Sequence, residues 1–238
     1  MTTIANALQA VRQRIAQAAT AAGRPAAGIQ LLAVSKTFPA AAVRQAYTAG
    51  QRAFGESYVQ EAEGKVAALI DLPLKWHFIG PIQSNKTRPI AESFSWVHSL
   101  DRARIADRLS AGRPSNLPDL QVCLQVNVSG ESSKSGVAPE ELPALARHVQ
   151  ALPRLKLRGL MAIPEPTDDP AKQRLAFARL RQLLEQLNTE GFQLDTLSMG
   201  MSDDLEAAIA EGATIVRVGS AIFGEREKIH HRDTEAQR

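Results

Sequence analysis

Strand-like and helix-like segments alternate along this chain from one end to the other. Short apolar runs, typical of buried parallel strands, are each followed by a segment with the period of an amphipathic helix. We predict strands at residues 31–35, 53–55, 76–79, 96–98, 122–128, 157–162, 196–199 and 215–218. We predict helices at residues 3–22, 39–50, 59–69, 85–91, 101–111, 139–151, 170–190 and 203–211.

This alternation favours a parallel sheet whose strands are joined by right-handed helical crossovers. Eight such units within 238 residues are typical of a closed barrel. We therefore predict the α/β class: a single-domain (β/α)8 TIM barrel over residues 1–238, with an extra N-terminal helix within residues 1–25 and a frayed tail at 226–238. An open doubly wound sheet is the alternative that the same alternation allows.

Composition argues against several classes of function. The net charge is only +3, aromatic residues make up 5%, and no basic run is interleaved with aromatics, so we expect no nucleic-acid binding. The single cysteine, Cys123, lies in an apolar run and is predicted to be a buried thiol, which fits a reducing compartment. No apolar stretch is long enough to span a membrane, and residues 1–22 lack a signal-peptide core. We expect a cytoplasmic monomer.

The barrel topology predicts where the functional site lies, because active sites of such barrels form at the carboxyl ends of the strands. The residues at or just after these ends are Lys36, Gly55, Glu56, Ser57, Ile79, Gly80, Ser99, Asn127, Met161, Met199, Gly200, Met201, Ser202, Arg217, Val218, Gly219 and Ser220. Glycine and polar residues dominate this set.

Lys36 directly follows an apolar strand. Apolar surroundings lower the pKa of a lysine amine and free its lone pair to form an imine. The alternative is an ordinary surface lysine whose stem covers apolar residues.

Two turns of small residues follow the last two strands, at Ser202 and at Gly219 and Ser220. Small residues let backbone N–H groups approach an anion closely, so neighbouring turns can form a phosphate cup. Arg217 shares a strand face with Gly219, and inside the barrel its charge would need an acceptor, either a carboxylate or a pyridine nitrogen. The cup and Lys36 together predict a phosphorylated aldehyde held as a Schiff base.

Several ordered motifs also carry a resemblance. The segments are 33–37, 54–56, 77–86, 126–127, 159–161, 197–203 and 216–224, with Glu131, Lys134 and Gly136. From about residue 10 to 226, the chain resembles the pyridoxal 5′-phosphate (PLP) homeostasis proteins. This resemblance implies a barrel of the alanine racemase N-terminal type, with PLP on Lys36.

The same resemblance implies the other cofactor contacts. It implies that the phosphate is held near Ser202, Gly219 and Ser220, and that Arg217 faces the pyridine nitrogen. Ser57, Asn127 and Met199 complete the expected PLP-binding set. Several family members have an asparagine where this chain has Ser57, so the contact of that asparagine is in question here.

The function that the resemblance implies is intracellular PLP homeostasis. We expect a protein that buffers PLP or delivers it to PLP-dependent apoenzymes, with no catalytic residue and no metal. Arginine beside the ring nitrogen disfavours its protonation. The racemases take their second base from a tyrosine on an added C-terminal domain, whereas this chain ends soon after strand eight, and Tyr47 and Tyr58 are poor substitutes.

Two enzymatic alternatives stay open. One is a weak PLP-dependent amino-acid racemase, and the other, outside the family, is a Schiff-base aldolase acting on a sugar phosphate. His77 is a candidate second base or an inner-barrel residue. Lys134 is a candidate for PLP transfer, for phosphate binding, or for an ordinary solvated side chain.

Overall fold

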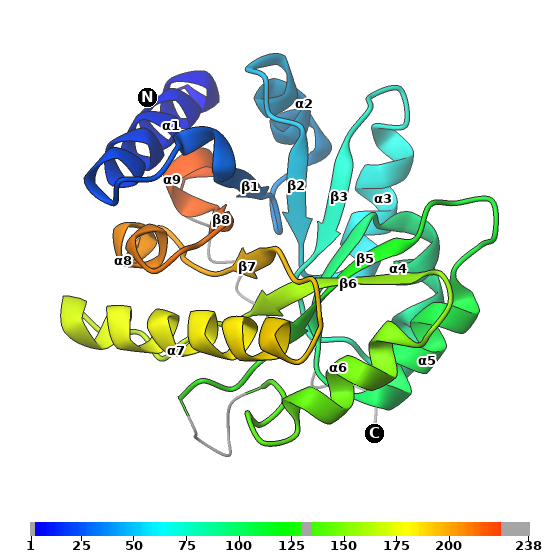
Figure 1. Cartoon of the computed structure of the whole chain (residues 1–238). Coiled ribbons are helices and arrows are strands. Elements are labelled where there is room, and N and C mark those ends of the chain that lie inside the picture. The colour runs from blue at the N-terminus through cyan, green and yellow to red at the C-terminus, as the bar shows by residue number, and fades with distance from the viewer. Residues whose placement is uncertain (1–2, 130–134, 225–238) are drawn as a thin grey trace, which may run out of the picture.

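The protein, a computed structural model describing residues 3–129 and 135–224, is a closed parallel barrel surrounded by helices (Figure 1). Its strands follow chain order around the barrel, and β1 pairs with β8 to close it. The strands are β1 (Gln30–Val34), β2 (Ala53–Glu56), β3 (Lys75–Phe78), β4 (Trp96–Leu100), β5 (Leu120–Gln125), β6 (Leu155–Met161), β7 (Thr196–Ser198) and β8 (Ile215–Val218). The predicted barrel is confirmed, and the open sheet is wrong.

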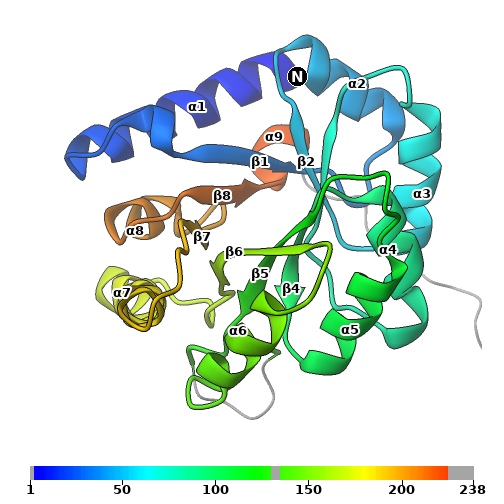
Figure 2. The ribbon, with the colours of Figure 1, turned by 45° about the vertical axis from the view of Figure 1, so that its right-hand side comes forward.

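Helices cover the outside of the barrel. The helices are α1 (Ile4–Ala21), α2 (Ala40–Thr48), α3 (Val59–Ala68), α4 (Thr87–Ser93), α5 (Ala103–Gly112), α6 (Leu142–Gln150), α7 (Pro170–Thr189), α8 (Leu205–Ala210) and α9 (Ser220–Phe223), with short 3-10 turns at Ala26–Gly28 and Ser84–Lys86. The extra N-terminal helix is α1, which packs beside α8 and α9 (Figure 2). Within the described residues, none of the helices is both long and apolar enough to cross a membrane.

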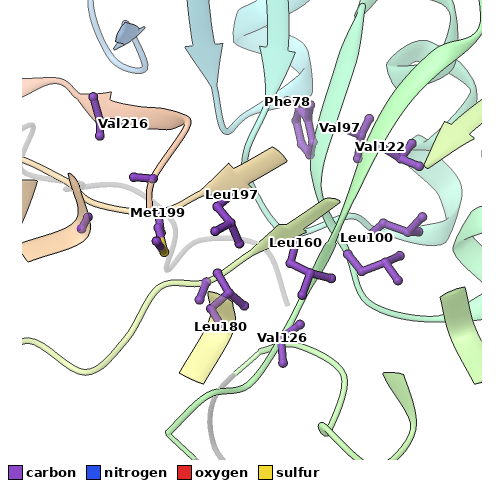
Figure 3. Close-up of a cluster of buried hydrophobic side chains, with 14 of the residues drawn as sticks. Phe78, Val97, Leu100, Val122, Val126, Leu160, Leu180, Leu197, Met199 and Val216 are labelled. Atoms are coloured by element: carbon purple, nitrogen blue, oxygen red, sulfur yellow. The ribbon is translucent and has the colours of Figure 1, made fainter. Parts of the chain in front are cut away.

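The main hydrophobic core lies between the barrel and the helices. Alternate strand residues point outward into it, as the period of two along a strand requires. Figure 3 shows Val97 of β4, Val122 of β5 and Leu197 of β7 in this layer, with Leu180 of α7 among them. The other face of each strand points into the barrel, where Leu32, Ala53 and Ile215 form a second, smaller apolar cluster.

Candidate functional site

Lys36 lies two residues after Val34, the last residue of β1. Ser35 before it is buried, whereas Lys36 itself is half-buried. Val34 aligns with Gly55 of β2, and the Ser35 N–H donates to the Gly55 carbonyl at 3.0 Å, so the chain stays alongside β2 up to the residue before Lys36. The lysine thus lies at the carboxyl-end mouth of the barrel, as predicted.

A buried ion network holds the backbone on both sides of Lys36. The Lys65 ammonium of α3 donates to the Ser35 carbonyl oxygen at 2.6 Å and to Oε1 of Glu56 at 2.8 Å. It also donates to Glu61, whose Oε1 accepts the Thr37 backbone N–H at 2.6 Å. Thr37 has φ +70°, a left-handed conformation that a β-branched residue rarely adopts. The Lys36 backbone is therefore clamped at both of its neighbours.

Glu56 is the most buried member of this network. Its side chain is fully buried, and the Ser35 hydroxyl donates to its Oε1 at 2.6 Å. Burial raises the pKa of Glu56, while the Lys65 charge and the hydrogen bonds from Lys65 and Ser35 oppose that shift. Lys65 is therefore the cation that supports a buried carboxylate at this position.

The predicted phosphate residues come together at the ends of β7 and β8. Ser198 aligns with Ile215, and the Arg217 N–H donates to the Gly200 carbonyl at 2.9 Å. This pairing places the turn after β7 next to the turn after β8. The Ser202 and Ser220 hydroxyl oxygens lie 3.4 Å apart. Two hydroxyl donors from neighbouring turns therefore face the same small space.

Gly219 lies at a close approach between two backbone segments. A Cβ at this position would lie 3.1 Å from the Val34 carbonyl oxygen and 3.3 Å from the Val34 Cβ. Ala33 pairs with Val218, so Gly219 lies beside Val34, just before the lysine segment. The absence of a side chain lets the turn after β8 lie against the end of β1.

Arg217 points into the barrel and is 3% exposed. Its guanidinium donates to the Ser198 hydroxyl oxygen and to the Ala162 carbonyl, each at 2.9 Å. Burial lowers the pKa of Arg217 to about 10, which leaves it charged at neutral pH. Among the residues that the structure describes, no carboxylate pairs with it at ion-pair distance, so the carboxylate alternative receives no support.

Two buried histidines extend the hydrogen-bond network of Arg217 through the barrel interior. Nδ1 of His98 lies 2.7 Å from the Ser198 hydroxyl oxygen, and Nε2 of His98 lies 2.9 Å from Nδ1 of His77. Burial lowers the pKa of His77 to about 3 and that of His98 well below its usual value. Of the two roles considered for His77, the inner-barrel one matches this position.

The remaining predicted residues differ in where the structure places them. Ser57 and Asn127 are half-buried and follow the ends of β2 and β5. The Met199 side chain lies instead in the core between the barrel and the helices (Figure 3), and its N–H donates to Ile215, so its side chain is not at the mouth. Lys134 and the predicted frayed tail lie outside the described residues.

The buried thiol of Cys123 is confirmed. Its side chain is fully buried, and burial raises the pKa of the thiol to about 12. Within residues 3–129 and 135–224, no group of histidine, cysteine and acidic side chains is arranged to hold a metal ion.

The mouth therefore combines an amine, two hydroxyls, a close-packed glycine turn and a buried cation without a carboxylate partner among the described residues. Hydroxyl and backbone donors suit a phosphate, and an arginine suits an acceptor atom deeper in the barrel. A ligand that carries a phosphate, a carbonyl group and a further hydrogen-bond acceptor fits this donor set.

Comparison with known proteins agrees with this geometry. Residues 7–227 match the family model described as alanine racemase, N-terminal domain. The pyridoxal phosphate homeostasis protein of Pseudomonas aeruginosa is 69% identical over 227 residues, which are 95% of this chain and 97% of that protein.

Solved structures agree as well. PipY of Synechococcus elongatus, solved with PLP bound, superposes with a TM-score of 0.82 at 41% identity, covering 93% of this chain and 100% of that one. Alanine racemase of Corynebacterium glutamicum shares the fold, with a TM-score of 0.69 at 16% identity over 95% of this chain and 64% of that one.

Proposed function

This chain belongs to the pyridoxal phosphate homeostasis protein family, and from that premise we propose that it binds PLP and acts in PLP homeostasis, buffering the cofactor or delivering it. When bound, PLP supplies an aldehyde that condenses with a lysine amine, releasing water, and an electron-poor ring. Lys36 is the residue we propose for the aldehyde. The observation that carries this proposal is that Lys36, the paired hydroxyls and Arg217 belong to one barrel mouth.

The proposed contacts follow the observed donors. The Ser202 and Ser220 hydroxyls and the backbone at Gly219 bind the phosphate, and Arg217 donates to the ring nitrogen. A cation at that nitrogen disfavours its protonation, which makes the ring a weaker electron sink. This electrostatic setting suits a carrier better than a racemase.

The wider cellular setting is also part of the proposal. We place the protein in the cytoplasm as a monomer that passes PLP to PLP-dependent apoenzymes. Ser57 and Asn127 are proposed as contacts along the sides of the cofactor. Because the Met199 side chain lies in the core, only the backbone of Met199 is proposed to contact the cofactor.

Borohydride trapping tests the lysine assignment. Reduction of the PLP-loaded protein should fix the cofactor to Lys36, as read by peptide mass spectrometry, and Lys36→Ala should lose both the adduct and the visible band. Lys75→Ala is the matched control, since Lys75 is exposed at the opposite end of the barrel. An adduct mainly on Lys134 or Lys86 would overturn the assignment.

Affinity measurements test the phosphate cup. Loss of one hydrogen bond to a charged group costs roughly 1.5–3 kcal/mol, so Ser202→Ala should weaken PLP binding about tenfold or more. Binding of pyridoxal, which lacks the phosphate, should be unchanged by the same substitution. Equal affinity of the wild type for PLP and pyridoxal would contradict the cup.

A further inference from the structure

A continuous line of hydrogen bonds runs through the barrel interior from Arg217 to His77. It passes from the Arg217 guanidinium to the Ser198 hydroxyl at 2.9 Å, on to His98 at 2.7 Å, and then to His77 at 2.9 Å. None of the four residues is more than 3% exposed. Nε2 of His77, at the far end, has no hydrogen-bond partner among the described residues.

Counting donors and acceptors gives this line a direction. A guanidinium can only donate, so the Ser198 oxygen accepts from Arg217. If the Ser198 hydroxyl then donates to Nδ1 of His98, Nε2 of His98 carries the proton and donates to Nδ1 of His77. This order leaves a single unsatisfied group in the line, the Nε2–H of His77.

The opposite order is poorer. If His77 donates to His98, and His98 donates to Ser198, the Ser198 proton has no acceptor among the described residues. The Nε2 lone pair of His77 is then unsatisfied as well. Buried polar groups are costly without partners, so the order that leaves one of them unsatisfied is favoured over the order that leaves two. The Arg217 charge also polarises the Ser198 hydroxyl toward donation.

We infer that Ser198, His98 and His77 are positioning residues that fix Arg217 through a one-way chain of hydrogen-bond donors. This inference rests on the proposed function, in which Arg217 meets the ring nitrogen of PLP. With Ser198 held by His98, and the Ala162 carbonyl as second acceptor, the guanidinium has two anchors and a set orientation. Its charge is thereby kept in one place, although none of the carboxylates that the structure describes pairs with it.

Nitrogen NMR tests the direction of the chain in the wild-type protein. With 15N-labelled histidine, His98 and His77 should each show a protonated Nε2 and an unprotonated Nδ1 at neutral pH, with assignments made from His98→Gln and His77→Gln variants. Protonated Nδ1 in both rings, or a doubly protonated ring, would overturn the inference. This result does not depend on whether PLP binds.

A serine substitution tests the effect on the cofactor. Ser198→Ala should shift the visible absorption band of the PLP complex and weaken PLP binding about tenfold. Ser110→Ala is the matched control, because Ser110 of the outer helix α5 is also buried and its hydroxyl donates to the Pro153 carbonyl.

The outcomes separate the two proposals. If the two alanine variants have the same spectrum and affinity as each other, the positioning role is wrong while PLP binding stands. If the wild type binds no PLP, the proposed function fails, and so does the positioning of Arg217 toward the ring. Should Ser198→Ala fail to fold, the histidine tautomers of the wild type decide whether the chain runs as described.

Discussion

At the scale of single residues, the site residues that sequence reasoning found are those that follow the ends of strands. Lys36, Ser202 and Gly219 can be located by counting strands, because barrel topology brings strand ends to one mouth. Lys65 could not be located in this way. Its spacing from Glu61 is that of an ordinary surface pair on a helix, and only the packing of α3 against β1 and β2 buries it.

Removing the Lys65 charge should destabilise the protein strongly. Lys65→Met leaves the fully buried Glu56 without its cation, and breaking a buried pair in this way typically costs about 3–5 kcal/mol. Urea unfolding of the PLP-free protein measures the change. Adding Glu56→Gln to Lys65→Met should recover much of the loss, because it removes the unpaired charge. Equal stability of Lys65→Met and the wild type would show that the network contributes nothing.

At the scale of elements, periodicity located the strands and the longer helices but not every boundary. Helix α7 begins at Pro170 as predicted, because the Asp169 side chain accepts the Ala171 N–H at its start. Helix α6 begins at Leu142, later than the predicted residue 139, since the residues before it form turns. Helix α9 was missed because its four residues are too few to show a period.

A side chain at Gly219 should strain the contact between the ends of β1 and β8. Gly219→Ala presses a methyl group against the Val34 carbonyl, so PLP affinity and the melting temperature should both fall. Gly64→Ala is the control. A Cβ at Gly64 meets nothing within 4 Å, and alanine in a helix interior stabilises by roughly 0.5–1 kcal/mol relative to glycine. Calorimetry of both variants checks the opposite signs, and a stabilised Gly219→Ala would refute the packing argument.

At the scale of the whole molecule, the buried histidines make stability depend on pH. The pKa of His77 is about 3 in the folded protein because of burial, whereas an unfolded histidine titrates near 6.5. Between these values the unfolded chain binds the extra proton. The free energy of unfolding should therefore fall as pH drops below about 6.5, by about 1.4 kcal/mol per pH unit for each histidine.

Urea unfolding at pH 7.5 and pH 5.5 measures this dependence. Glu56, whose pKa is raised by burial, acts in the opposite direction, so the informative comparison is between variants. His77→Phe should reduce the dependence of the unfolding free energy on pH. His148→Gln is the control: His148 is partly exposed, so this substitution should leave the contribution of the buried histidines unchanged. An unchanged slope in His77→Phe would contradict the assignment of a neutral His77.

Turnover is the second property of the whole molecule. We predict no efficient conversion of any amino acid, because Arg217 at the ring nitrogen, as proposed above, would disfavour protonation of the ring and weaken it as an electron sink. The PLP-loaded protein is incubated with each common L-amino acid, and enantiomers and keto acids are followed by chiral chromatography. Rates on the order of 1 s⁻¹ or faster would restore the racemase alternative.

The pairing of β1 with β8 also has a consequence for the order of events during synthesis. Lys36 leaves the ribosome early, whereas Arg217, Gly219 and Ser220 are among the last barrel residues to be made. A nascent or truncated chain therefore has the amine without the phosphate cup. In the proposed site, the residues that bind the phosphate therefore reach Lys36 only when β8 pairs with β1, so a chain that ends before β8 should bind PLP no more tightly than it binds pyridoxal.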